Sequence, residues 1–288
     1  MGADEGARRS SSPSDVDAQV LAHFESTVVS EWERMTATFA DRVSLELHLR
    51  LLARHVHTGD RVLEVGAGAG RFSLELARLA GALTVTDISP AQLAAAAVRL
   101  RLEGLDGVME GFDVVDVRDL SRFGAGSFDV VCAFGGPLSY CFEGAGGALE
   151  QVASVLRPGG TLVASVMSNA GASRAFGERF AALIDEVGLD AVGAVVATGD
   201  LRPVQPSGHT CQMYYADELV ELVDASPLQL LECSASSWLA TGSPLGLERA
   251  CEDPAVWEAF VDWEEAVASR PGALDGGTHL LFAARTAS

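Results

Sequence analysis

The chain contains no lysine, and its 20 basic residues are all arginine. They are outnumbered by 40 acidic residues, which gives a formal net charge of −20. A domain this acidic repels a phosphate backbone, so we expect no nucleic-acid partner. The absence of lysine also excludes a P-loop, because that motif needs a lysine to reach the nucleotide phosphates.

Cysteines and long apolar runs are scarce as well. The five cysteines form no C-x-x-C pair and no cluster with histidine, so we expect reduced thiols and no metal site. The longest uncharged run, residues 158–173, contains proline and glycine and is too short to span a bilayer. The first residues lack the apolar segment of a signal peptide. These absences predict a soluble, cytoplasmic protein that does not enter a membrane.

The remaining composition favours one α/β domain. Residues 1–14 are small, polar and charged with no apolar period, which predicts a disordered leader. From residue 15 to residue 288, strand and helix patterns alternate as in a doubly wound, mostly parallel sheet. We expect cap helices over residues 15–58, a ligand-binding core over 59–168, and two helical insertions over 169–214 and 238–277 that form a substrate cap.

The first of the expected cap helices carries an apolar stripe at helical spacing, from Val20 to Phe39. A second helix follows, with Val43, Leu47 and Leu51 on one line. The helical pair either packs on the body of the domain or lies over a cofactor cleft. In the second case Phe24, Trp32 or His48 would face a substrate.

The core is organised around the stretch from Arg61 to Asp87, which reads RVLEVGAGAGRFSLELARLAGALTVTD. An apolar strand leads into a glycine-rich turn, a helix and a second strand that ends in a carboxylate, which is half of a nucleotide-binding unit. A dinucleotide fingerprint requires a small residue where Arg71 stands. Glu64, two residues before the first glycine, would repel a pyrophosphate and suits a cation. These features favour S-adenosylmethionine (SAM), which carries a sulfonium and an ammonium and no phosphate.

The same stretch resembles the signature h-h-[DE]-h-G-x-G-x-G of the class I SAM-dependent methyltransferases. The resemblance continues through VTDIS, FDVVDVRDL, SFDVV and VLRPGGTLVAS, so that it spans residues 62–168. It implies a Rossmann-like sheet of seven strands whose last strand, residues 279–284, is antiparallel. It also implies an enzyme of the type that methylates small molecules.

The resemblance further implies how the adenosine would be held. Asp87 would accept hydrogen bonds from both ribose hydroxyls, and Ile88 would pack on the adenine. Asp116 would accept from the adenine amino group beside the Val117 backbone. Asp113, in the same FDVVD stretch, is a rival for this role.

The methionine part of SAM would lie near the turn. Glu64 and the carbonyl of Phe134 suit its ammonium. The glycine-rich turn would approach the ligand with its backbone, through Gly66, Ala67, Gly68 and Gly70.

The methyl acceptor would contact residues outside these motifs. Methyl transfer mostly needs alignment of the reactants, and a base is needed only when the acceptor carries a proton. His279 begins the antiparallel strand and therefore lies at the edge where the parallel strands end. His209 lies at the end of the first insertion, and Tyr140 follows the fourth strand. We name these three as catalytic candidates, with a structural hydrogen-bonding role as the alternative for each.

The sequence thus predicts a SAM-dependent methyltransferase that acts on an oxygen or nitrogen of a small organic molecule, with secondary metabolism as one setting. The alternative is a SAM-binding enzyme that performs C-methylation or non-methyl SAM chemistry, and a SAM sensor without catalysis is the third hypothesis. A nucleic-acid amino methyltransferase would carry [DNS]-P-P-[YF] where this chain reads FGGPLSY. The identity of the acceptor and the oligomeric state stay open.

Overall fold

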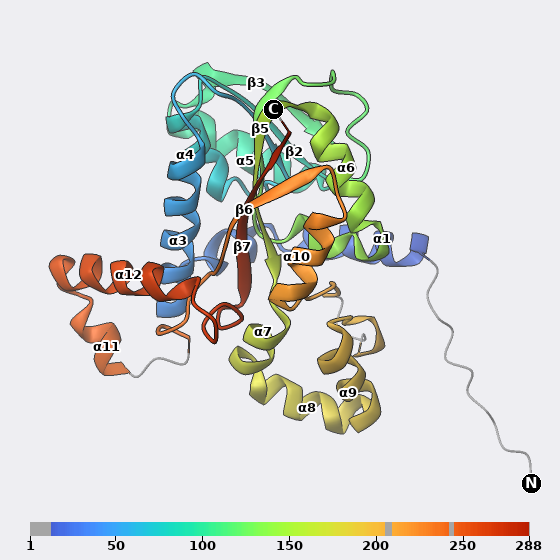
Figure 1. Cartoon of the computed structure of the whole chain (residues 1–288), viewed down its shortest axis with the longest axis vertical. Helices are drawn as coiled ribbons and strands as arrows, with labels where there is room; N and C mark the ends of the chain where they lie inside the picture. The colour runs from blue at the N-terminus through green and yellow to red at the C-terminus, as the bar shows by residue number, and fades with distance from the viewer. Residues whose placement is uncertain (1–12, 205–208, 242–244, 288) are drawn as a thin grey trace, which may run out of the picture.

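A computed structural model describes residues 13–204, 209–241 and 245–287. Seven strands form one sheet in the order β3-β2-β1-β4-β5-β7-β6 (Figure 1). All neighbouring strands are parallel except β7, which runs antiparallel to β5 and β6. The strands are β1 (Arg61–Val65), β2 (Ala82–Asp87), β3 (Met109–Val114), β4 (Phe128–Ala133), β5 (Leu156–Met167), β6 (Leu228–Ala235) and β7 (His279–Thr286). The predicted fold class, including the antiparallel last strand, is confirmed.

Helices cover both faces of the sheet because successive strand residues point to opposite sides. In β1, Val62 packs into the core under α3, α4 and α5, whereas Leu63 packs into the core under α6 and α10. Figure 1 shows α3 and α4 on one side of the sheet and α6 and α10 on the other. The five helices are α3 (Phe39–His55), α4 (Arg71–Leu79), α5 (Pro90–Leu102), α6 (Ala145–Val155) and α10 (Ala216–Asp224).

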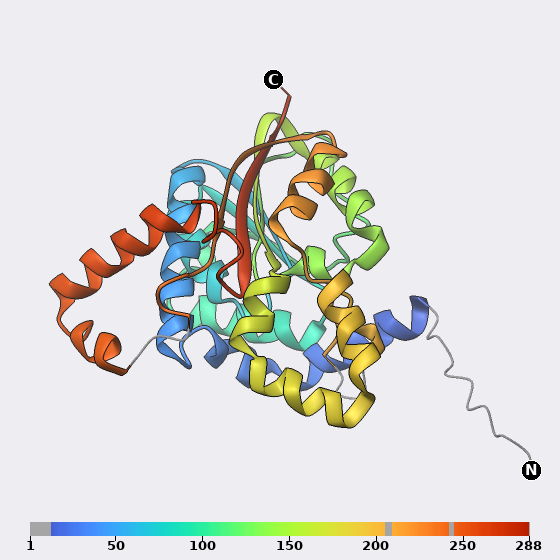
Figure 2. The same cartoon turned by 60° about the horizontal axis from the view of Figure 1, so that its bottom comes forward.

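Two further groups of helices lie across the carboxyl edge of the parallel strands (Figures 1 and 2). One group is α1 (Pro13–Ser26) and α2 (Val28–Arg34), and the other is α7 (Asn169–Ala175), α8 (Gly177–Val187), α9 (Leu189–Thr198) and the short η4 (Arg202–Val204). The rings of His23 in α1 and His209 after η4 are 5.1 Å apart, so the two groups meet over this edge. The expected leader, residues 1–14, lies outside the described residues except for its last two, which begin α1.

The apolar stripe over residues 20–39 does not form one continuous helix. The Thr27 hydroxyl donates to the carbonyl of His23 at 3.0 Å, and the chain bends there between α1 and α2. A capping box of Thr38 and Asp41 then begins α3. The stripe is therefore divided over three helices, and this division lets α1 and α2 cross the sheet edge while α3 packs on its face.

The last helices, α11 (Leu245–Ala250) and α12 (Pro254–Ala268), extend beside α3 (Figure 1). The buried carboxylate of Glu264 in α12 accepts hydrogen bonds from the backbone of Trp238, Leu239 and Ala240 at 2.8, 3.1 and 2.5 Å. Residues 236–241 lie beside the start of β7, because Ser236 Oγ accepts from the His279 backbone at 3.1 Å. Across the described ranges, no helix has the length and apolar character needed to cross a membrane.

Replacing Glu264 with alanine should strongly destabilise the fold. Three backbone N–H groups, that of the buried Ala240 among them, would lose their acceptor, and a buried N–H group left unpaired costs about 1–3 kcal/mol. We expect the free energy of unfolding to fall by about 3 kcal/mol or more, measured by denaturant titration. Glu258→Ala on the same helix is the control, because that side chain is 70% exposed and should cost little. Equal effects of the two substitutions would contradict the assignment.

Candidate functional site

The glycine-rich turn after β1 combines two packing glycines with one that faces open space. Gly66, Gly68 and Gly70 have φ values of +68°, +53° and +89°, which other residues rarely adopt. A Cβ at Gly66 would lie 2.4 Å from Pro137 Cγ, and one at Gly70 would lie 2.9 Å from the Ala96 Cα. At Gly68 no atom lies within 4 Å of the corresponding position. The turn therefore closes on the body at its ends and leaves room for a ligand at its middle.

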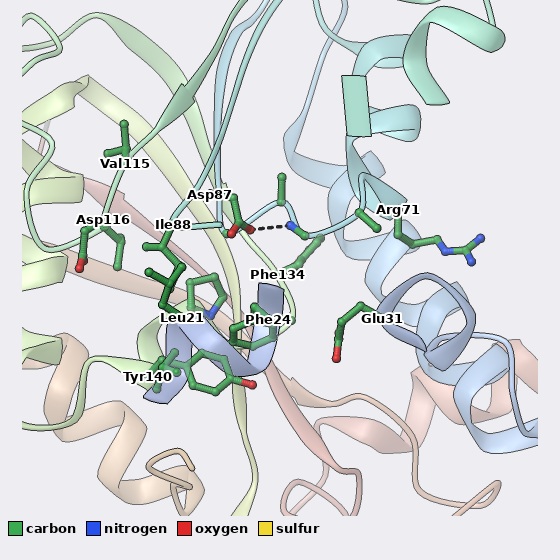
Figure 3. Close-up of a pocket in the computed structure, with 18 of the residues that line it drawn as sticks. Leu21, Phe24, Glu31, Arg71, Asp87, Ile88, Val115, Asp116, Phe134 and Tyr140 are labelled. Atoms are coloured by element: carbon green, nitrogen blue, oxygen red, sulfur yellow. Dashed lines mark hydrogen bonds between the residues drawn. The ribbon is translucent and has the colours of Figure 1, made fainter. Parts of the chain in front are cut away.

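Asp87, the last residue of β2, holds this turn in place. Its carboxylate accepts from the Gly68 backbone at 2.7 Å and from the Ser89 backbone at 2.8 Å. Burial raises the pKa of Asp87 to about 6, although these two N–H groups favour the ionised form. Figure 3 shows the bond to the turn and the carboxylate at the centre of the pocket.

A cavity of about 370 Å³ extends along this edge of the sheet. Figure 3 shows Asp116 toward one end, Asp87 in the middle, and Glu31 and Arg71 toward the other end. Helices α1 and α2 contribute lining residues, among them Leu21 and Phe24. Of the predicted cofactor-binding residues, eight line the cavity: Gly66, Ala67, Gly68, Asp87, Ile88, Asp116, Val117 and Phe134.

The other two predicted cofactor residues, Glu64 and Gly70, do not line this cavity. Glu64 is 2% exposed and accepts a hydrogen bond from the Ser73 hydroxyl at 2.5 Å. Burial raises the pKa of Glu64 to about 8, so the carboxyl is mostly protonated at neutral pH. This placement does not support a direct contact with a ligand ammonium, and it weakens the argument that Glu64 repels pyrophosphate.

The two candidate aspartates for the adenine lie in different places. Asp113 is inside β3, pairs with Arg122 at 2.8 Å and does not line the cavity. Asp116 lines it and pairs with Arg118, which also reaches Asp17 of α1 at 2.9 Å. The geometry favours Asp116, and it shows that the same arginine links α1 to the strand ends.

Several polar residues of this site have no recognisable motif in the sequence. Glu31 and Arg34 of α2 form an ion pair at 3.1 Å and line the cavity. Arg71 stacks on the ring of Trp32 at 3.7 Å and donates to its carbonyl, while the Nε atom of Arg71 is buried and has no partner in the described part of the chain. The position of Arg71 immediately after the glycines could have identified it as a site residue from the sequence. The sequence of α2 shows only its apolar stripe, which does not identify Glu31 or Arg34.

A second cavity, of about 440 Å³, adjoins the first. Both are lined by Glu31, Arg34, Met35, Gly135 and Tyr140. All three predicted catalytic residues, His209, His279 and Tyr140, line the second cavity, and Tyr140 lines both. The structure thus brings together three residues that are far apart in the sequence.

The protonation states of these three residues follow from burial. Burial lowers the pKa of His209, and it lowers that of His279 well below the usual value, with Arg34 adding to both shifts. Burial also raises the pKa of Tyr140, which stays protonated. The Tyr140 hydroxyl and His209 Nε2 are 3.1 Å apart. At neutral pH the site therefore presents neutral imidazoles and a phenol.

A hydrogen-bonded chain supports the wall between the two cavities. The Gly135 backbone donates to Ser165 Oγ at 2.9 Å, and Ser165 Oγ lies 3.2 Å from His48 Nε2. His48 Nδ1 is 2.7 Å from the carbonyl of Ser44 and must donate to it, so Nε2 accepts from Ser165. Burial lowers the pKa of His48 to about 4, which keeps this neutral form.

The N-terminal helices were expected either to pack on the body of the domain or to lie over the cofactor cleft. Phe24 and Trp32 line the first cavity, so α1 and α2 lie over the cleft. His48 lines neither cavity and instead supports the wall from behind. No group of three His, Cys, Asp or Glu side chains arranged to hold a metal ion occurs among the described residues.

The strand order, the glycine turn and the acidic strand end define a Rossmann-like nucleotide-binding domain. Residues 62–160 match the family model for a methyltransferase domain, and this stretch belongs to that family. The ubiquinone biosynthesis O-methyltransferase of Xanthomonas axonopodis pv. citri (strain 306) is 36% identical over 127 residues, which make up 40% of this chain and 46% of that protein. The enzyme of the same name from Nitrosococcus oceani is 30% identical over 118 residues, 41% of this chain and 49% of that protein. The chain thus spans about half the length of these curated relatives.

Solved structures share the fold over most of the chain. The N-methyltransferase NodS from Bradyrhizobium japonicum WM9, crystallised with S-adenosylhomocysteine, has a TM-score of 0.57 at 17% identity and covers 94% of this chain and 100% of its own. The [4+2]-cyclase SpnF has a TM-score of 0.55 at 24% identity, with 84% of this chain and 80% of its own covered. Together with the matched domain, these likenesses show a methyltransferase domain over residues 62–160 and a Rossmann-like methyltransferase fold over most of the chain.

Two alanine substitutions in the turn should separate packing from ligand binding. Each places a side chain in the left-handed region, at a cost of about 1–2 kcal/mol. Gly66→Ala adds the collision with Pro137 and should lower the melting temperature further. Gly68→Ala adds no collision, but its methyl group extends into open space beside the cavity, so we expect weaker SAM binding by calorimetry with the smaller loss of stability. The reverse order of stabilities would contradict this description of the turn.

Proposed function

We propose that this chain transfers a methyl group from SAM to an oxygen or nitrogen of a small organic molecule. The observation that carries the proposal is the junction of two cavities at Gly135 and Tyr140. One cavity has the lining expected for SAM, and the other gathers His209, His279 and Tyr140. Two ligand spaces that share a wall suit a reaction that depends on aligning a donor with an acceptor.

The adenosine half of SAM fits the residues around β2 and β3. Asp87 offers acceptors to the ribose hydroxyls, and Ile88 and Val117 offer apolar contact to the adenine. Asp116 lies beside them as an acceptor for the adenine amino group. The open space at Gly68 allows close approach to the backbone.

The methionine half fits the other end of the cavity. Glu31 and Arg71 offer opposite charges for the ammonium and the carboxylate, and the unpartnered Nε of Arg71 suits a carboxylate oxygen. When bound, SAM supplies a methyl group that is already activated on its sulfonium. The residues of this chain would then have to orient the acceptor and hold its proton. His279 Nε2, which is buried and has no partner among the described residues, is a candidate atom for that proton.

Removal of the Asp87 carboxylate should weaken SAM binding at least about tenfold, because hydrogen bonds to a charged acceptor contribute about 1.5–3 kcal/mol. We expect this loss in Asp87→Ala by isothermal titration calorimetry. The pKa of Asp87, about 6, adds a pH dependence. Since the ionised form binds the hydroxyls, the affinity of the wild-type protein should fall as the pH drops below that value. Asp113→Asn, outside the cavity, is the control, and unchanged affinity in Asp87→Ala would refute the cofactor site.

The reaction type is tested separately. Incubation of the protein with SAM and a cell extract should yield S-adenosylhomocysteine in step with a product that is heavier by one methylene group, detected by mass spectrometry. Bound SAM without S-adenosylhomocysteine would point instead to non-methyl SAM chemistry or to a SAM sensor. A methylated product whose new methyl group is bonded to carbon would support the C-methylation alternative.

A further inference from the structure

The second cavity has two chemically different walls. One wall carries polar side chains: Tyr140, which also lines the first cavity, His209, whose Nε2 lies 3.1 Å from the Tyr140 hydroxyl, and Thr278 and His279. The wall formed by β5, the insertion and the residues that follow it is apolar and includes Met167, Phe176, Phe180, Leu183, Val204 and Met213. A molecule that fills this space must therefore combine a large apolar surface with a polar group.

The apolar wall favours an aromatic ring. It combines two phenyl rings with two thioethers, and both groups make favourable contacts with aromatic faces and edges. Phe176 is 53% exposed, which leaves apolar surface for a ligand to cover. Phe180 and Leu183 belong to α8, so the insertion supplies most of this contact.

The charged side chains around the cavity are already engaged. Arg34 pairs with Glu31 at 3.1 Å, and Arg179 pairs with Glu186 at 2.6 Å. Asp41 accepts from the Thr38 backbone at 3.0 Å within the helix cap. Among the described residues that line the cavity, each arginine thus has an acidic partner. An anionic ligand would have to compete with Glu31 or Glu186 for these arginines, whereas an uncharged ligand would not.

His279 offers a buried, unpaired polar atom to a ligand in the second cavity. The residue is 4% exposed, and its Nδ1 lies 3.1 Å from Thr278 Oγ1. Nε2 is buried and has no hydrogen-bond partner in the described residues. An unpaired buried nitrogen costs about 1–3 kcal/mol, and a ligand hydroxyl that reaches it would remove this cost.

We propose that the second cavity binds an uncharged phenol, an aromatic ring with apolar substituents whose hydroxyl forms a hydrogen bond with His279 Nε2. The inference rests on the proposed function, since it specifies the acceptor of that reaction as an aromatic oxygen. The inference concerns only which molecule the second cavity binds, so it can be tested by binding measurements without catalytic turnover.

Three small probe molecules with similar skeletons separate the contribution of a hydroxyl group to binding from those of the apolar skeleton and of a negative charge. Thymol is an uncharged phenol with alkyl substituents, p-cymene has the same skeleton without the hydroxyl, and cuminate carries a carboxylate in place of the methyl group of p-cymene. Binding to the full chain saturated with S-adenosylhomocysteine is followed by ligand-observed NMR titration. We expect thymol to bind about tenfold more tightly than cymene, because it satisfies the buried nitrogen, and cuminate to bind most weakly. Equal or tighter binding of cuminate would overturn the proposal.

Two variants test the named contact. His279→Leu should reduce thymol affinity to the level of cymene and leave cymene binding unchanged, whereas His279→Gln, which keeps a polar group, should restore part of the difference. Unchanged thymol binding in a folded His279→Leu protein would refute the contact. If His279→Leu does not fold, the comparison of thymol with cymene on the wild-type protein and on His279→Gln decides. Binding of S-adenosylhomocysteine without any preference for thymol refutes this inference alone, whereas thymol binding without S-adenosylhomocysteine binding refutes the proposed function.

Discussion

The hydrogen bond from the Gly68 backbone to the buried carboxylate of Asp87 joins the glycine-rich turn after β1 to the acidic end of β2, and the site depends on both. β1 and β2 are parallel, with Val65 opposite Thr86, so the turn after one strand meets the end of the other. The carboxylate is costly in the free protein: its pKa is raised to about 6, so stability is lost as the pH rises from about 4 through that value, by roughly 3 kcal/mol. A ligand that donates hydroxyl hydrogen bonds to Asp87 offsets this cost. The turn is therefore held by a group that also favours a ligand.

The part of the site that could be predicted from the sequence lies on strand ends. Asp87 ends β2 and Asp116 follows β3, and parallel strands bring their carboxyl ends to one edge, so their position in the chain determined their position in space. His279 could be placed by the same logic, because an antiparallel strand begins at that edge. The glycines were recognisable for a related reason. Their left-handed backbone excludes most other residues, and the sequence therefore shows the turn directly.

The other features of the site could not be predicted, because they depend on contacts between segments that are distant in the sequence. The protonation of Glu64 follows from burial beside Ser73, which no pattern reveals. His48 reads as one residue of a helix, yet its partner Ser165 is 117 positions away. Glu31 and Arg34 reach the cavities only because the chain bends near Thr27 and carries α2 across the sheet edge. In each case the side chain is ordinary in its local sequence, and tertiary packing alone makes it part of the site.

Part of the boundary between the cavities is backbone, at Gly135, and this suits the chemistry. Gly135 lines both cavities and has a φ of +79°, a conformation that favours glycine, so this position keeps a residue without a side chain between the two ligand spaces. The buried pair Ser165 and His48 fixes the Gly135 N–H from behind. Tyr140, at the end of the turn that follows, then lines both spaces. A transfer that needs alignment more than acid–base chemistry gains most from such a rigid boundary, since a flexible side chain at this point would loosen the geometry of both partners.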